Sequence, residues 1–258
     1  MGRPNVGLLS AELCQGSPAV RAEAGCLRWR LMRVETAVER SALGQIWQSH
    51  WQSPTFRVEL PVSLGTLLGV GWLYSRVGAW IEARSGTVLD DPILRHLPAL
   101  DLTWFTFSVM YVAVISALVS LLHHPYRLLF GLRVYAGVML MRLVAMYLTE
   151  LDDPLTAIPL QDPVTRLIFQ VRTIPTKDLF FSGHTATMFT LYLMATNALQ
   201  RHAFLAGTVV IGVCVLLQHV HYAFDVFAAP FFAFGVYHLV GRIRGESQLS
   251  DRSRPGSP

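Results

Sequence analysis

The strongest constraint on this chain is a set of six mainly apolar runs, each of roughly 20 residues, the length with which an α-helix crosses the hydrocarbon core of a bilayer. The runs are residues 61–81, 103–122, 128–149, 179–199, 203–219 and 222–241. Because lipid offers no hydrogen-bond partners, each run must satisfy its own backbone polar groups and is predicted to be a helix. The sequence has no polar helices to wrap these runs in a soluble fold. We therefore expect an all-α, multi-pass membrane protein with six transmembrane helices.

The composition of the 258-residue chain agrees with a membrane protein. Only 15% of its residues are charged, whereas an average soluble domain has about 25%. Three cysteines are too few for a disulfide scaffold, and we expect no disulfide. We predict a cytoplasmic N-terminal segment (1–58), a six-span membrane domain (59–241) and a disordered cytoplasmic tail (242–258). Met32 is an alternative translation start to Met1.

The distribution of basic residues predicts the orientation, because cytoplasmic segments of membrane proteins are enriched in lysine and arginine. With a cytoplasmic N-terminus, 13 of the 21 basic residues fall in cytoplasmic segments and five in outer loops. We therefore expect both termini in the cytoplasm and the segments 82–102 and 150–178 on the extracytoplasmic side. The net charge of +4 follows from this topology, and no basic patch with interleaved aromatic residues indicates nucleic-acid binding.

Two polar segments interrupt the apolar pattern, residues 178–185 and 219–226. An ionisable side chain within a span costs about 2.5–3.5 kcal/mol on insertion scales, so such residues are functional candidates by default. In the expected topology both segments lie at the outer leaflet, where a helix begins. A helix N-terminus attracts anions through its unpaired N–H groups and its partial positive charge. The placement therefore favours a phosphate site.

The first segment offers a cap and a proton donor. Ser182 is predicted to cap a helix that begins at Gly183, and the missing side chain of Gly183 lets a phosphate approach the backbone. His184 then lies in the first turn, beside the phosphate. The alternative is that this tripeptide is only a helix cap.

The second segment offers a nucleophile. His221 and Asp225 are four residues apart, which puts them in contact on one helix face. A carboxylate on one imidazole nitrogen leaves the other nitrogen free to attack. We therefore predict phosphoryl transfer in which His221 attacks phosphorus, Asp225 orients it and His184 protonates the leaving oxygen. The alternative is a structural hydrogen bond between His221 and Asp225.

These two segments resemble a known family. Ser182-Gly183-His184-Thr185 and His221-Tyr222-x-x-Asp225-Val226 are similar to the signature segments of the sphingomyelin synthase-related branch of the type 2 phosphatidic acid phosphatase superfamily. The resemblance covers about residues 60–240 and implies a six-span, PAP2-like helical bundle with an outward-facing active site. It also implies a catalytic triad of His184, His221 and Asp225. The activity it implies is transfer of a phosphorylated head group from a glycerophospholipid to ceramide, releasing diacylglycerol.

The chain also departs from the family pattern. Thr176 and Lys177 replace a Cys-Gly pair, and Ala145 replaces a threonine in a third motif, of which Arg142 and Tyr147 are retained. These departures leave the donor head group and the acceptor open. The Lys-x6-Arg-Pro and Ser-Arg-x5-His motifs of the phosphatase branch are absent from the sequence, which argues against a plain lipid phosphatase.

Three further residues are candidates for binding phosphate or substrate. Arg142 either holds the phosphate or forms a structural ion pair with Asp178 or Asp225. Asp178 supports His184, receives a cationic head group or is a solvated loop carboxylate. Tyr222 contributes a cation-binding face or is an ordinary interfacial aromatic residue.

We therefore predict an integral membrane enzyme that uses a phospholipid donor and a lipid-alcohol acceptor through a phosphohistidine, without a metal or cofactor. The segment 150–178 is long enough to cover the site and exclude water, which separates transfer from hydrolysis. Two alternatives stay open. One is a lipid phosphatase or phospholipase C-like hydrolase with the same three residues, and the other is a non-catalytic membrane scaffold or transporter. The sequence leaves the oligomeric state open.

Overall fold

The computed structural model describes residues 42–160, 162 and 177–252, which fall in two compact units, Met1–Ser53 and Pro54–Pro258. The described part of the first unit is a helix over residues 42–51 followed by a short turn. The alternative start at Met32 lies outside the described residues. The second unit contains both polar segments and all of the candidate site residues.

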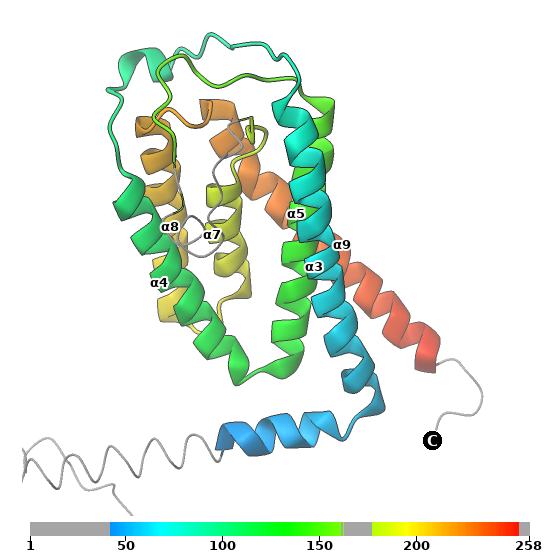
Figure 1. The fold of residues 1–258 in the computed structure, drawn as a ribbon. Helices are drawn as coiled ribbons and strands as arrows, with labels where there is room; N and C mark the ends of the chain where they lie inside the picture. Colours follow the sequence, from blue (N-terminus) through cyan, green and yellow to red (C-terminus); the bar gives the residue numbers. More distant parts are fainter. Residues whose placement is uncertain (1–41, 161, 163–176, 253–258) are drawn as a thin grey trace, which may run out of the picture. The chain divides into compact units, whose positions relative to one another are not determined.

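The second unit is built from α-helices, and no β-strand occurs in its described part (Figure 1). Its elements are α3 (Pro54–Glu82), the 3-10 helix η2 (Leu94–His96), α4 (Thr103–Leu122), α5 (Pro125–Leu148), α7 (Gly183–Met194), α8 (Ala198–Leu217) and α9 (Ala223–Arg252). The prediction of an all-α fold is confirmed.

Four helices are long and apolar enough to cross a membrane: α4, α5, α8 and residues Ala223–Ile243 of α9. They fit an integral membrane protein, but the predicted count of six spans is not confirmed. Helix α3 covers the first predicted span, yet glycines, serines and Arg76 interrupt its apolar residues. Helix α7 has only 12 residues, which is about 18 Å of helix against a hydrocarbon core of about 30 Å.

The predicted span 179–199 is not one continuous helix. Ser182 caps α7 as predicted, because its hydroxyl oxygen accepts a hydrogen bond from the Thr185 N–H at 3.4 Å. The Asn197 side chain caps α8 in the same way, accepting from the Gln200 N–H at 2.9 Å. A side-chain cap fixes a helix start, so α8 begins at Ala198 and the connection we predicted at 200–202 belongs to this helix.

Helix α9 continues beyond residue 241, where we expected the last span to end. It runs to Arg252, so the first part of the segment predicted to be disordered is helical. Residues 242–252 contain one glycine and no proline, and the next proline is Pro255, so no strong helix breaker lies within them. Residues 253–258 lie outside the described part of the chain.

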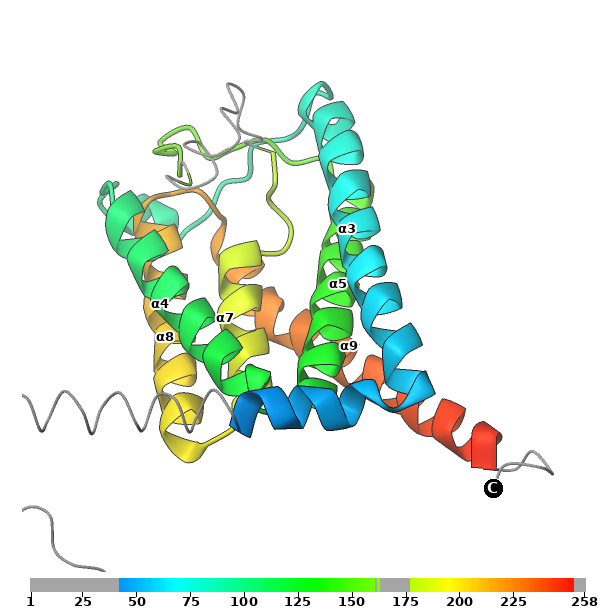
Figure 2. The same cartoon turned by 60° about the horizontal axis from the view of Figure 1, so that its bottom comes forward.

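The short helix α7 lies inside the bundle, packed against α4, α5, α8 and α9 (Figures 1 and 2). One core cluster joins α7 and α8 through Met188, Ile211 and Val215. A second joins α7 and α9, with Ala186 and Ala229 both fully buried. Small side chains allow two helix backbones to approach closely. The beginnings of α7 and α9 are thereby brought together.

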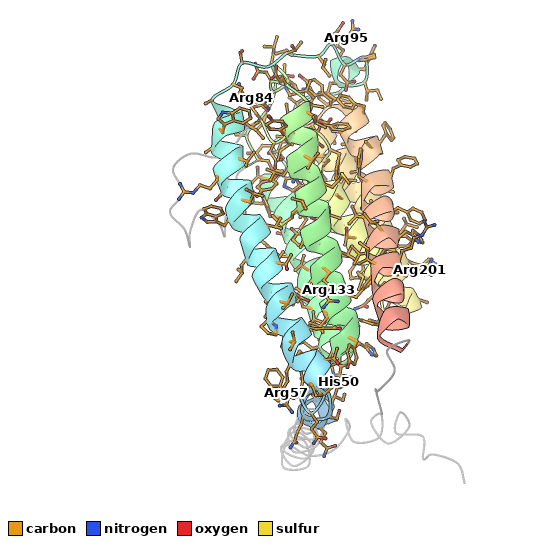
Figure 3. All side chains as sticks on the ribbon, turned by 90° about the vertical axis from the view of Figure 1, so that its right-hand side faces the viewer. His50, Arg57, Arg84, Arg95, Arg133 and Arg201 are labelled. Carbon is orange, nitrogen blue, oxygen red and sulfur yellow. The ribbon has the colours of Figure 1, made fainter. Side chains whose placement is uncertain are left out.

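The segments 83–102 and 149–160 lie at one end of this unit, the end at which α7 and α9 begin (Figure 1). They are joined to each other by backbone hydrogen bonds from Thr87 N–H to Glu150 O (2.9 Å) and from Asp152 N–H to Thr87 O (3.1 Å). Figure 3 shows Arg84 and Arg95 at this end and Arg57 at the other. We call this end the loop end.

Candidate active site

His184 and His221 face each other in the interior of the bundle, at the loop end. Their ring centroids are 6.1 Å apart, with the ring planes inclined at 65°. His184 is the second residue of α7. The ring of Phe107, from α4, packs against the His184 ring in a T-shaped arrangement, with the ring centroids 5.8 Å apart. The Nδ1 atom of His184 is buried and has no hydrogen-bond partner within the described part of the chain. The two imidazoles are therefore close enough to act on the same substrate group.

The contact between His221 and Asp225 that the sequence predicted is present, although its local geometry differs. The His221 Nδ1 atom lies 3.5 Å from Asp225 Oδ2. His221 precedes α9 by two residues, so the pair does not share a helix face. Asp225 instead reaches back over the first turn, and its Oδ2 atom also accepts from the Tyr222 N–H at 3.1 Å. The carboxylate thus holds the turn that carries His221 and lies beside its ring, while the Nδ1 atom itself makes no hydrogen bond within the described part of the chain.

Asp225 also links the beginnings of α7 and α9. Its backbone carbonyl accepts a hydrogen bond from the Ser182 N–H at 3.1 Å. The residue is fully buried, and its Oδ1 atom has no hydrogen-bond partner among the described residues. Buried polar atoms without a hydrogen-bond partner are rare in native proteins. The Oδ1 atom of Asp225 is therefore available to accept a hydrogen bond from a substrate or a water molecule. The helix beginnings that carry His184 and His221 are therefore fixed to each other directly.

Arg142, from α5, packs against the beginning of α7. Its Nε–H donates to the Phe181 carbonyl at 2.9 Å, and Nη2 lies 2.6 Å from Asp178 Oδ1. A Cβ atom added to Gly183 would collide with the guanidinium group. Of the alternatives that the sequence left open for Arg142, the ion pair with Asp178 is present. Glycine at position 183 admits the cation to the backbone of α7.

Asp178 is an ionised partner and not a solvated loop carboxylate. Burial acts to raise the pKa of Asp178, but the Arg142 guanidinium and the Tyr74 hydroxyl hold it below its ordinary value of 3.8. The Tyr74 O–H, from α3, donates to Asp178 Oδ1 at 2.5 Å. Tyr74 is a site residue that sequence reasoning missed, because it is one tyrosine in an apolar run and its partner is 104 residues away.

Tyr222 is buried beside the site, and its hydroxyl is already occupied. The hydroxyl accepts from the Leu89 N–H at 3.0 Å and donates to the Asp152 carbonyl at 2.8 Å. Only 1% of the residue is exposed. These bonds tie both loop-end segments to the residue that follows His221, and they account for Tyr222 without a substrate cation.

Asp91 is a second residue that the sequence did not reveal. Its Oδ2 atom accepts from the Ala223 N–H at 2.6 Å, and its Oδ1 atom accepts from the Ile93 N–H at 2.8 Å. It therefore caps α9 from a segment 132 residues earlier in the chain. The sequence signal for an N-cap is local, so a cap from this distance is invisible to it.

Lys177 connects the segments on both sides of the site. Its Nζ atom lies 2.6 Å from Asp152 Oδ1, and its backbone N–H donates to Glu82 Oε2 at 3.1 Å. The hydrogen bond from Lys177 lowers the pKa of Asp152 below its ordinary value. Lys177 thus anchors the chain immediately before Asp178.

The predictions about a metal and about a covering segment stay predictions. No cluster of three or more metal-ligating side chains occurs within residues 42–160, 162 and 177–252. Residues 163–176, the greater part of the segment predicted to cover the site, lie outside the described residues. That segment's role as a cover stays a prediction.

A comparison with known protein families matches residues 177–242 to the family described as PAP2 superfamily C-terminal. The matched stretch contains α7, α8, most of α9 and the residues His184, His221 and Asp225. The match supports placement in the type 2 phosphatidic acid phosphatase superfamily. It suggests a lipid enzyme of the phosphatase or phosphotransferase type. No curated protein matches the chain.

Proposed function

We propose that this protein is a lipid phosphotransferase of the sphingomyelin synthase-like type. It moves a phosphorylated head group from a glycerophospholipid to a lipid alcohol such as ceramide. The observation that carries the proposal is the pair of histidine rings, 6.1 Å apart, at the beginnings of two adjoining helices. One of the two rings, that of His221, lies beside a fully buried carboxylate, with its Nδ1 atom 3.5 Å from Asp225 Oδ2.

In the first step His221 is the nucleophile. Asp225 accepts the Nδ1–H of His221, so the Nε2 lone pair is free to attack the phosphorus of the donor. The bond between phosphorus and the diacylglycerol oxygen breaks, and its electron pair stays with that oxygen. His184, as the imidazolium, donates a proton to the oxygen. Diacylglycerol leaves, and the phosphorylated head group remains on His221.

In the second step His184 acts as the base. It takes the proton from the hydroxyl group of the acceptor, whose oxygen attacks phosphorus. The bond from phosphorus to Nε2 breaks, and the electron pair returns to His221. The product carries the head group, and both histidines regain their initial protonation states.

Groups of this chain stabilise the negative charge on the oxygens of the transferred phosphoryl group. The beginnings of α7 and α9 lie beside the two histidines, and helix beginnings favour anions. Arg142 adds a full positive charge beside Gly183. Fixed positive groups in a water-poor site stabilise developing negative charge more strongly than water does.

The location of the site in the membrane is part of the proposal. The site lies at the loop end, and the distribution of basic residues assigns that end to the extracytoplasmic side. Both termini are then cytoplasmic. Transfer is favoured over hydrolysis because both signature motifs of the phosphatase branch are absent from the sequence.

The test is activity in vesicles that contain a head-group-labelled phospholipid and ceramide. We expect His221→Ala, His184→Ala and Asp225→Asn each to lose at least about 100-fold in rate, as for general acid–base residues. His202→Ala is the matched control, because His202 is exposed near the beginning of α8, which lies at the end of the unit opposite to the loop end. Wild-type activity in all three site variants would contradict the mechanism. Release of a water-soluble head-group phosphate without acceptor would indicate a hydrolase.

A further inference from the structure

One oxygen atom at the site is shared by two donors from different helices. The Tyr74 O–H of α3 lies 2.5 Å from Asp178 Oδ1, and Arg142 Nη2 of α5 lies 2.6 Å from the same atom. The Arg142 guanidinium also lies over the Tyr74 ring, 5.8 Å from its centroid. Tyr74, Asp178 and Arg142 therefore form a closed group in which each member contacts the other two.

Among the described side chains of this group, Arg142 is the one that contacts the beginning of α7. Its Nε–H donates to the Phe181 carbonyl, and its guanidinium occupies the space left open by Gly183. Only 11% of the Arg142 side chain is exposed. Because the Arg142 guanidinium is this confined, its position depends on the groups that contact it.

We propose that Tyr74 is a positioning residue, which acts through Asp178 to hold the Arg142 guanidinium at the phosphate-binding end of α7. The inference rests on the proposed function, because it assigns a residue to the same site. The Tyr74 hydroxyl donates one of the hydrogen bonds that Asp178 Oδ1 accepts. Without it, that oxygen interacts with Arg142 alone and draws the guanidinium toward the carboxylate and away from the phosphate.

The test is a double-mutant cycle of Tyr74→Phe and Asp178→Ala, read as kcat/KM for transfer. We expect Tyr74→Phe to lower kcat/KM by about tenfold in the wild-type background. In the Asp178→Ala background, where the Tyr74 hydroxyl has lost its acceptor, the same change lowers kcat/KM by less than about twofold, because Tyr74 acts through Asp178. An equal loss in both backgrounds overturns the inference.

The matched control is Tyr147→Phe. Tyr147 is exposed on α5, and no hydrogen bond of its hydroxyl occurs within the described part of the chain. The control variant keeps wild-type kcat/KM. A loss in Tyr147→Phe equal to that in Tyr74→Phe overturns the inference, since the effect then belongs to any tyrosine of the bundle.

A second measurement is independent of turnover. Inorganic phosphate, added to the detergent-solubilised protein, raises the Tm of the wild type because a ligand that binds the native state stabilises it. The rise is smaller in Tyr74→Phe and unchanged in Tyr147→Phe. If transfer is absent but the phosphate shift depends on Tyr74, the proposed function fails and the positioning role stands. Equal shifts in wild type and Tyr74→Phe, or no shift in the wild type, overturn the positioning role.

Discussion

At position 183 a side chain has no room. A Cβ atom there would collide with the guanidinium of Arg142, the group that brings positive charge to the beginning of α7. The sequence predicted a glycine that admits phosphate to the backbone, and the structure shows that the same glycine admits Arg142. The residue thus determines where the cation lies relative to His184.

We expect Gly183→Ala to destabilise the protein by about 1–3 kcal/mol, the usual cost of overpacking, and to lower transfer activity because Arg142 is displaced. Gly235→Ala is the control, because no atom lies within 4 Å of a Cβ built there. In a helix that change is neutral or stabilising. Thermal unfolding of the two variants measures the difference, and equal Tm values would contradict the packing argument.

The predictability of the site residues follows from how far apart in the chain their partners are. His221 and Asp225 are four residues apart, and Ser182 caps a helix that begins one residue later, so local rules identified them. The ion pair between Arg142 and Asp178 was one of several open alternatives, because composition does not select a partner. Tyr74 and Asp91 were missed, since their contacts join elements more than 100 residues apart.

Among the elements, the beginning of α9 depends most on a distant segment. Asp91 caps this helix through the Ala223 N–H, while Tyr222 bonds both loop-end segments. The two catalytic candidates His221 and Asp225 lie on either side of these contacts. The segment 83–102 therefore supports the site, although it contributes none of its reacting groups.

We expect Asp91→Ala to cost about 1–2 kcal/mol of stability, because an N-cap is lost, and to lower kcat as the turn at His221 loosens. Asp90→Ala is the matched control. Asp90 is exposed and pairs only with the exposed Arg95 among the contacts described, at 3.0 Å, and such surface pairs contribute at most about 1 kcal/mol. Chemical denaturation in detergent compares the two. A larger effect of Asp90→Ala would contradict the assigned cap.

Helix boundaries were harder to predict than helix positions. Helices α4 and α5 fall within a few residues of the predicted runs, because uninterrupted apolar sequence leaves little choice. The run 179–199 divides into α7 and the beginning of α8, since hydropathy does not register the cap at Asn197. The short α7 is enclosed by the other helices, so its length is not set by the thickness of the membrane.

In the proposed topology the loop end of the molecule faces away from the cytoplasm. Leu155 lies in a loop-end segment and is 91% exposed, whereas Leu199 lies at the beginning of α8, at the opposite end, and is 81% exposed. In a background without Cys14, Cys26 and Cys214, each leucine is replaced by cysteine. We expect a membrane-impermeant thiol reagent to label Leu155→Cys on intact cells and Leu199→Cys only after permeabilisation. The reverse pattern would contradict the proposed orientation.

The proposed mechanism requires His221 to carry the phosphorylated head group during turnover. The direct measurement is peptide mass spectrometry of protein incubated with donor phospholipid without acceptor and quenched in alkali, in which phosphohistidine survives. We predict a mass increase equal to the phosphorylated head group on the peptide that contains His221, present in His202→Ala and absent in His221→Ala. A modification on another residue, or full transfer by a protein that lacks His221, would contradict this mechanism.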